Sequence, residues 1–314
     1  MKNRILVLIL FSYQCGLAQV PVQLLSSPAR GHYKQLEIFS SKPTGQSSQD
    51  TLRFPYNSTL AERRLSLKPI FLSKTTPADF HLPEVPANSS ELTRAELNYL
   101  LTLQEQRTDL EIKTSLTMAG IYYNPRTQPG DSLYNSYRKN LFFIGRSIGT
   151  WFNAEQLPLT AALMAKVWQD ASYFIWSFKY KYARVRPYVL EPDINNLEET
   201  NWAAYPSGHA ANSYINAYIF TALAPEYSDV FIKDAYDMAH SREILGVHYP
   251  SDSEASRLLA QQLVSKLFLN KDFLVEFEKV KQEWKVQAKE KFQKPDVIGK
   301  KGAATGASCA KKCE

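Results

Sequence analysis

The sequence predicts an all-α fold, a bundle of helices packed around one apolar core. From residue 93 onward, apolar side chains recur at three- and four-residue intervals, which is the spacing of one face of a helix. Segments with the two-residue alternation of strands are scarce, and no internal repeat is found. Apolar residues make up 44% of the 314 residues, enough for a sizeable core. Together these observations favour a helical bundle.

Caps and stops along the chain place the individual helices. The expected helices begin near Thr93, Pro158, Ser207, Ser228, Ser251 and Phe273. Thr93 with Glu96, and Ser251 with Glu254, fit capping boxes, in which the two side chains hydrogen-bond to the first turn of the helix. Gly246 is typical of the residue that ends a helix, so it separates the fourth helix from the fifth.

The first residues have the pattern of an export signal. Lys2 and Arg4 precede an apolar run over residues 5–11, and small residues favour cleavage after Ala18. Cys15 offers lipid attachment as an alternative, which is less favoured because bulky residues precede it. No later stretch is apolar enough over sufficient length to cross a bilayer, so the sequence predicts a soluble mature protein, periplasmic or secreted.

Three short segments combine residue types that phosphate chemistry needs. They are Lys179 with Arg186-Pro187 after six residues, the run Pro206-Ser207-Gly208-His209, and Ser241-Arg242 followed at fixed spacing by His248 and Asp252. Each segment alone has an ordinary explanation: a solvated basic face, a helix-entry turn, or a surface His–Asp pair. Their combination in one chain favours a functional site.

The cations and one helix start would hold an anion. Lys179, Arg186 and Arg242 supply three positive charges, and an arginine fork matches two phosphate oxygens. Ser207 and Gly208 lie at an expected helix N-terminus, where unpaired N–H groups and the helix dipole favour negative charge. These five residues are therefore the predicted phosphate-binding set.

The two histidines of the motifs supply a nucleophile and an acid. His248 lies on the turn between Gly246 and Pro250, and Asp252 is placed to accept its Nδ1–H, which would leave Nε2 free to attack phosphorus. His209, beside the anion-binding turn, is the candidate general acid for the leaving group.

The remaining histidines and cysteines indicate no metal centre. His32 lies in loop-like sequence near the N-terminus, His81 in a later loop, and His240 next to the third motif, where a structural role is favoured. Cys309 and Cys313 favour a local disulfide in the tail over a metal site. The sequence therefore predicts neither a metal nor a cofactor.

The three motifs resemble the signature of the type-2 phosphatidic acid phosphatase (PAP2) and vanadium haloperoxidase superfamily, K-x6-RP, PSGH and SR-x5-H-x3-D. Within it, the stretches YARVRPYVL (182–190), AAYPSGHAANSY (203–214) and HSREILGVHYPSDSEASRL (240–258) are most similar to bacterial class A non-specific acid phosphatases. The likeness covers roughly residues 93–267. Departures occur at Ala203-Ala204, where members often carry Gly-Ser, and at Ala210, where Thr is common.

The resemblance implies an all-helical fold of the PAP2/haloperoxidase kind and a phosphohistidine intermediate. It implies that His248 is the nucleophile, Asp252 its partner and His209 the acid. It implies phosphate binding by Lys179, Arg186, Ser207, Gly208 and Arg242. The expected organisation is a signal peptide (1–18), a Ser/Pro-rich extension (19–92), a helical catalytic domain (93–270), and an amphipathic helix with a flexible tail (271–314).

The function expected from these patterns is a metal-independent acid phosphatase that hydrolyses small phosphate monoesters. Vanadate, which mimics phosphate, is expected to inhibit it. The alternatives are a vanadate-dependent haloperoxidase, a lipid or pyrophosphate phosphatase, and a non-catalytic anion-binding protein. The net charge of +6 is spread along the chain rather than concentrated, so no nucleic-acid partner is expected. The apolar helices would allow the chain to form a homo-oligomer.

Overall fold

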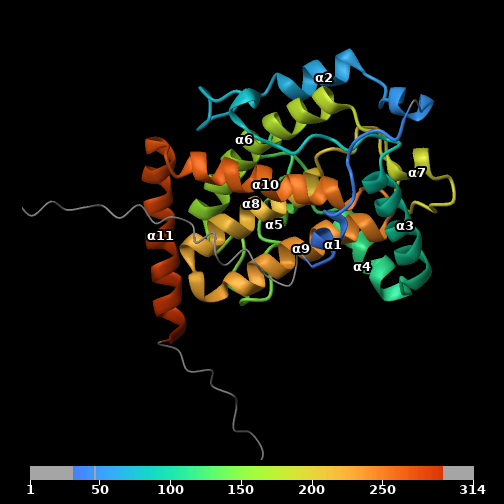
Figure 1. The fold of residues 1–314 in the computed structure, drawn as a ribbon. Coiled ribbons are helices and arrows are strands. Elements are labelled where there is room, and N and C mark those ends of the chain that lie inside the picture. Colours follow the sequence, from blue (N-terminus) through green and yellow to red (C-terminus); the bar gives the residue numbers. More distant parts are fainter. Residues whose placement is uncertain (1–30, 46, 293–314) are drawn as a thin grey trace, which may run out of the picture.

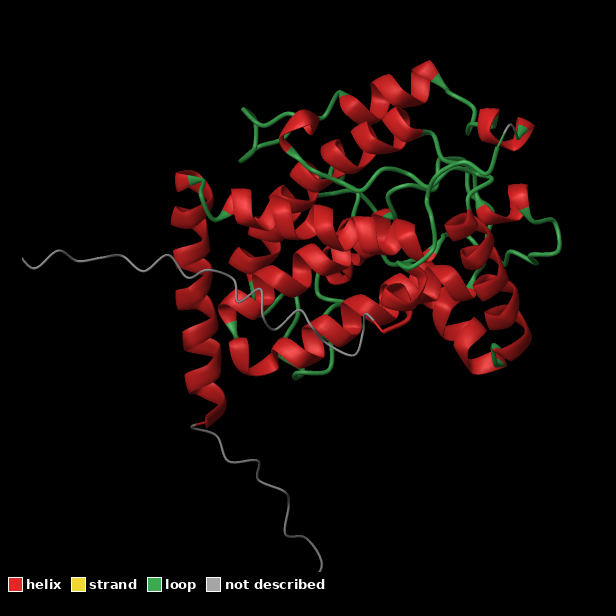
Figure 2. Ribbon diagram, viewed as in Figure 1, coloured by secondary structure: helices red, strands yellow, loops and turns green. Residues whose placement is uncertain are grey.

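A computed structural model describes residues 31–45 and 47–292 of the chain. Within these residues every regular element is helical and none is a strand (Figure 2), which confirms the all-α prediction. None of the helices in this part has both the length and the hydropathy that crossing a bilayer requires. The predicted export signal with Cys15, and the tail with Cys309 and Cys313, lie outside the described residues.

Helices of very different length make up the described fold (Figure 1). The α-helices are α1 Gly31–Leu36, α2 Ser58–Leu65, α3 Glu91–Gln106, α4 Asp109–Ala119, α5 Tyr134–Asn140, α6 Pro158–Tyr182, α7 Pro187–Leu190, α8 Gly208–Leu223, α9 Ser228–Ile244, α10 Pro250–Leu267 and α11 Lys271–Phe292. Short 3₁₀ turns occur at Ser48–Thr51, Pro77–Asp79 and Pro225–Tyr227.

Two predicted helix starts, one at a proline and one at a capping serine, are confirmed. α6 begins at Pro158, and the Ser207 side chain caps α8. Two caps lie earlier than expected. Ser90 rather than Thr93 caps α3, and α10 begins at Pro250, ahead of Ser251.

The centre of the bundle is α8. All residues from Ala210 to Thr221 are buried, and the helix packs against α6, α9 and α10. A helix that is apolar on all sides is typical of such a central position, whereas a surface helix carries one polar face. Because α8 is enclosed, its N-terminus is fixed relative to the three helices around it.

The C-terminal helix α11 closes one flank of the bundle against α6 (Figure 1). Its stripe of Phe273, Phe277, Val280 and Trp284 is buried, as the amphipathic pattern predicts. Glu283 also accepts hydrogen bonds from the first backbone N–H groups of α6, at residues 159 and 160. α11 therefore caps the helix that carries Lys179 at its other end.

The segment before α3 differs from the loop-like extension expected there, because residues 31–92 contain α1, α2 and part of the core. Phe71 and Leu72 are buried in the main cluster. The carboxylate of Asp170, on α6, accepts the backbone N–H groups of Ile70, Phe71 and Leu72. Burial raises the pKa of Asp170 to about 6, and these three hydrogen bonds oppose that shift. Asp170 thus fastens this segment to α6.

Candidate active site

The structure brings the three sequence motifs together around one cavity of about 430 Å³. Its lining includes Lys179 near the end of α6, Arg186 before α7, Gly208 and His209 in the first turn of α8, Arg242 in the last turn of α9, and His248 before α10. Ser207 and Asp252 are fully buried directly behind this lining. All eight predicted site residues are therefore in one place.

Asp252 holds the His248 ring through one of the two ring nitrogens. The distance from Nδ1 to Asp252 Oδ2 is 3.0 Å, and the same oxygen accepts the backbone N–H of Tyr249 at 3.0 Å. A carboxylate only accepts, so Nδ1 carries the proton and Nε2 keeps its lone pair, which accepts a hydrogen bond from Arg186 Nη1 at 3.0 Å. Burial and, next, the charge of Arg186 lower the pKa of His248 well below its ordinary value. The ring is therefore neutral and oriented.

A glycine turn sets the position of His248. Gly246 adopts a φ of 70°, and a Cβ at this residue would lie 2.9 Å from Ile194 Cγ2. Only glycine fits both the left-handed backbone and the close contact. The predicted helix end at Gly246 is thus confirmed, with α9 stopping at Ile244.

Two of the predicted phosphate-binding cations are held by backbone carbonyls. Lys179 Nζ donates to the carbonyls of Ala203 (2.7 Å) and Ala204 (3.2 Å), and Arg186 donates to those of Trp202 (2.9 Å) and Val247 (2.6 Å). Burial lowers the pKa of Lys179 and brings that of Arg186 to about 10. Because carbonyls carry no net charge, both side chains are positioned without being neutralised.

Arg242 is buried with part of its donor capacity unused. One NH2 group pairs with Glu198, but among the described residues Nε and Nη1 have no hydrogen-bond partner. A buried donor without an acceptor costs about 1–3 kcal/mol, so such groups are normally paired. Arg242 lines the cavity, so an anionic oxygen of a bound ligand could accept hydrogen bonds from these two groups.

The first turn of α8 adds backbone donors and a histidine. A Cβ built on Gly208 would meet only Ile175 Cγ2, at 3.8 Å, so the side facing the cavity is open. His209 Nε2 lies 3.0 Å from the carbonyl oxygen of Ala119. That carbonyl can only accept, so Nε2 carries a proton and Nδ1 is the nitrogen left for a substrate.

Sequence comparison identifies the segment that carries this constellation. Residues 158–268 match the PAP2 superfamily model. The resemblance seen in the sequence is thereby confirmed. The matched residues 158–268, called the PAP2 segment below, contain all eight candidate site residues.

Among curated proteins, the chain is similar to non-specific acid phosphatases. It is 33% identical to that of Providencia stuartii over 115 residues, which are 34% of this chain and 46% of the relative. It is 28% identical to that of Salmonella typhi over 144 residues, 43% and 57% of the two chains. The matches thus span about half the length of these relatives.

Two solved structures are similar to this chain at low identity and low TM-score. A transmembrane PAP2-type phosphatidylglycerolphosphate phosphatase from Bacillus subtilis is 18% identical, with a TM-score of 0.37, over 76% of this chain and 97% of its own. A bacterial vanadium-dependent iodoperoxidase is 14% identical, with a TM-score of 0.45, over 75% and 63%.

Arg184, within the PAP2 segment, is a site residue that sequence reasoning missed. It is buried, donates to Asp252 Oδ1 at 2.7 Å and to Glu96 Oε2 at 3.0 Å, and lies over the ring of Tyr249 at 3.7 Å. Burial alone would raise the pKa of Asp252, but Arg184 and His248 hold it below its ordinary value. The available indication was the Arg-x-Arg spacing, which places Arg184 two residues before Arg186.

Segments outside the PAP2 match also line the cavity. Aromatic and basic side chains gather there, namely Arg63, Arg64, Tyr122 and Arg126, beside Trp176 and Trp202 of the PAP2 segment. The Arg64 guanidinium lies 4.5 Å from the centre of the Trp176 ring and 5.4 Å from that of Trp202. This surface provides apolar and stacking contacts for the organic part of a ligand.

Proposed function

We propose that this protein is a metal-independent acid phosphatase that hydrolyses phosphate monoesters through a phosphohistidine at His248. Its similarity to non-specific acid phosphatases and its PAP2 segment support a phosphatase. The observation that carries the finer proposal is a buried, neutral, oriented His248 that shares one cavity with three buried cations. Export to the periplasm or beyond is part of the proposal and is tested by cell fractionation.

The reaction would proceed in two displacements at phosphorus. Nε2 of His248 forms a bond to phosphorus while the bond to the ester oxygen breaks, and His209 gives that oxygen a proton. Water then attacks the phosphohistidine and returns a proton to His209, which releases inorganic phosphate and the free imidazole. The cations and the N–H groups of the α8 N-terminus stabilise the charge that builds on the phosphoryl oxygens.

The electrostatics suit catalysis below neutral pH. The lowered pKa of His248 keeps Nε2 unprotonated in mild acid, and the lowered pKa of Asp252 keeps its carboxylate ionised there. Burial and, next, Arg242 also lower the pKa of His209. A phosphate dianion bound among the same cations would oppose this shift, so we infer that His209 takes up its proton when the substrate binds.

A direct assay tests the proposed function. Hydrolysis of p-nitrophenyl phosphate at acidic pH is expected, and it should be unchanged by EDTA because side-chain cations occupy the place of a metal clamp. Vanadate should inhibit more strongly than phosphate, since it adopts the five-coordinate geometry of phosphorus in transfer. Loss of activity that Mg²⁺ or Zn²⁺ restores would refute the metal-independent mechanism, and halide oxidation with vanadate and peroxide would favour a haloperoxidase.

Replacing His209 with alanine should change the dependence on the leaving group. With an alkyl phosphate, kcat/KM is expected to fall about 10²–10⁴-fold, the usual value of general acid catalysis. With p-nitrophenyl phosphate the loss should be much smaller, because that leaving group departs as a stable anion. The measurement is kcat/KM for wild type and variant across esters of graded leaving-group pKa.

The pH profiles provide the control for this role. If substrate binding protonates His209, the basic limb of kcat should lie at higher pH than that of kcat/KM, because kcat reports the complex and kcat/KM the free enzyme. This displacement should disappear in His209→Ala. A uniform loss with all leaving groups would instead assign His209 to phosphate binding alone.

A further inference from the structure

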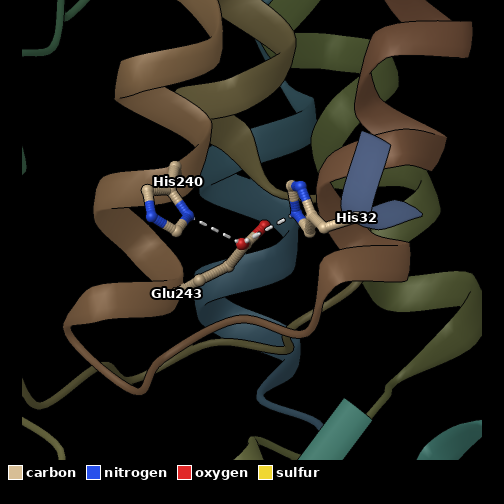
Figure 3. Close-up of side chains that lie close together, drawn as sticks. All are labelled: His32, His240 and Glu243. Atoms are coloured by element: carbon tan, nitrogen blue, oxygen red, sulfur yellow. Dashed lines mark hydrogen bonds and ion pairs between the residues drawn. The ribbon is translucent and has the colours of Figure 1, made fainter. Parts of the chain in front are cut away.

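A second cluster of chemically active side chains lies away from the cavity, where α1 meets α9. Figure 3 shows His32 on α1 pointing toward His240 and Glu243 on α9. His32 Nε2 lies 3.3 Å and His240 Nδ1 lies 3.1 Å from the same carboxylate oxygen, Glu243 Oε2. One potential ligand atom from each residue lies within 4.8 Å of the other two, and none of the three residues lines the phosphate cavity.

The carboxylate is held so that Oε2 faces the two histidines. Glu243 is fully buried, and its other oxygen, Oε1, accepts hydrogen bonds from Tyr33 Oη and Ser253 Oγ, both at 3.0 Å. Hydrogen bonds to the second oxygen of a ligating carboxylate are the outer-shell support typical of metal sites. They fix the direction of Oε2.

His32 Nε2 faces the Glu243 carboxylate without a well-formed hydrogen bond. It is buried and lies 3.3 Å from Glu243 Oε2, which is an ion pair only when the ring is protonated, and it makes no hydrogen bond to any described residue. The opposite nitrogen, Nδ1, lies 3.2 Å from Tyr236 Oη. If Nδ1–H donates to this hydroxyl, Nε2 carries the lone pair, which is the tautomer that binds metals. A lone pair directed toward a carboxylate oxygen is repelled unless a cation lies between them.

We propose that His32 Nε2, His240 Nδ1 and Glu243 Oε2 bind one divalent transition-metal ion, with zinc as the preferred ion. Zinc binds imidazole nitrogen and carboxylate oxygen at about 2.0–2.2 Å, so two ligand atoms at a tetrahedral angle lie about 3.3 Å apart. The observed separations from Glu243 Oε2 match this value, and the ion would replace the hydrogen bond of His240. Calcium and magnesium are disfavoured because they prefer all-oxygen sites.

The side-chain exposures of 16% for His32 and 24% for His240 leave a route for the ion and a water as fourth ligand. Such an ion would join a helix outside the PAP2 segment to α9, which also carries Arg242. It would act as a structural clamp, separate from the proposed chemistry at His248.

Zinc binding to the full-length chain tests this site. Cys309 and Cys313 could bind zinc themselves, so the reference protein carries Cys309→Ser and Cys313→Ser. After chelation and dialysis it should bind one Zn²⁺ in competition with a chromophoric indicator, and its melting temperature should rise on loading. In His240→Ala the affinity should fall by more than about 100-fold, beyond the 10–100-fold cost of losing an outer-shell partner.

Two further variants separate a ligand effect from a folding effect. Tyr236→Phe keeps the ring but removes the hydroxyl near His32 Nδ1, and it should weaken zinc by about 10–100-fold. His81→Ala removes an exposed histidine outside the cluster and should change nothing. Equal zinc binding by the reference protein and a folded His240→Ala, or none by the reference protein, would overturn the proposal. Turnover by the chelated protein is scored separately, because it tests the metal-independent mechanism and not this site.

Discussion

His248→Ala is expected to abolish phosphatase turnover and the covalent intermediate together. Removing a catalytic nucleophile in another covalent enzyme costs about 10⁶-fold in kcat, and we expect a loss of that order here. The physical reason is that Asp252 orients the His248 ring so that its Nε2 lone pair, 3.0 Å from Arg186 Nη1, faces the cavity that Lys179 and Arg242 also line. Rapid quench with ³²P-labelled substrate should trap an adduct, stable to base and labile to acid, in wild type only.

Imidazole added to the His248→Ala variant provides a positive control. The variant leaves space beside Asp252, and free imidazole bound there offers a nitrogen nucleophile to the same phosphoryl group. Partial recovery of turnover that depends on imidazole concentration would show that the cations and the leaving-group acid remain intact. Trapping the same protein-bound adduct in the variant would refute the assignment of the nucleophile.

Local patterns in the sequence predicted those parts of the fold that depend on neighbouring residues. The start of α6 at Pro158 and the Ser207 cap of α8 depend on the residue's own backbone preference and its next turn. The residue types of the three motifs likewise predicted which residues meet in the cavity, because each motif supplies a part that a phosphate site needs.

Contacts between distant segments were not predictable in this way. Glu96 fitted a capping box by spacing, but Ser90 caps α3 and Glu96 is buried against Arg184, 88 residues away. The same holds for His32 and Glu243, which lie 211 residues apart and share no spacing pattern. Whether a charged residue faces solvent or a partner is decided by tertiary packing, which a local pattern does not contain.

Asp252→Asn is the second substitution with a large expected effect, a fall in kcat of about 10⁴-fold, as for the equivalent change in a Ser-His-Asp triad. Asp252 accepts on both sides, from Arg184 at Oδ1 and from His248 and the Tyr249 N–H at Oδ2. An amide has only one acceptor oxygen. The charge of Arg184 should take that oxygen, because a hydrogen bond to a charged group is the stronger one.

The amide NH₂ would then face His248 Nδ1 and favour the tautomer with the proton on Nε2. That tautomer has no lone pair to attack phosphorus or to accept from Arg186 Nη1, although the substituted side chain keeps its size. The loss should therefore appear in kcat, while inhibition by phosphate changes much less, because Lys179, Arg186 and Arg242 are untouched.

Unfolding experiments add a pH signature to this substitution. Folding lowers the pKa of Asp252, so its contribution to the free energy of unfolding is fully present above the ordinary carboxyl pKa of about 4. That contribution is lost as the pH falls through the lowered value, and Asp252→Asn should remove this part of the acid dependence. Urea unfolding of both proteins over the acidic range measures it.

Glu96→Gln is the matched control, since it changes the carboxylate on the other side of Arg184 and leaves the His248–Asp252 pair in place. Its unfolding free energy should fall, because a buried partner of Arg184 loses its charge, but kcat should fall far less than in Asp252→Asn. If both variants lose kcat equally, the hydrogen-bonded series Glu96–Arg184–Asp252 has only a structural role, and another group must set the tautomer of His248. If only Asp252→Asn loses kcat, the carboxylate acts by directing the lone pair of His248 toward phosphorus.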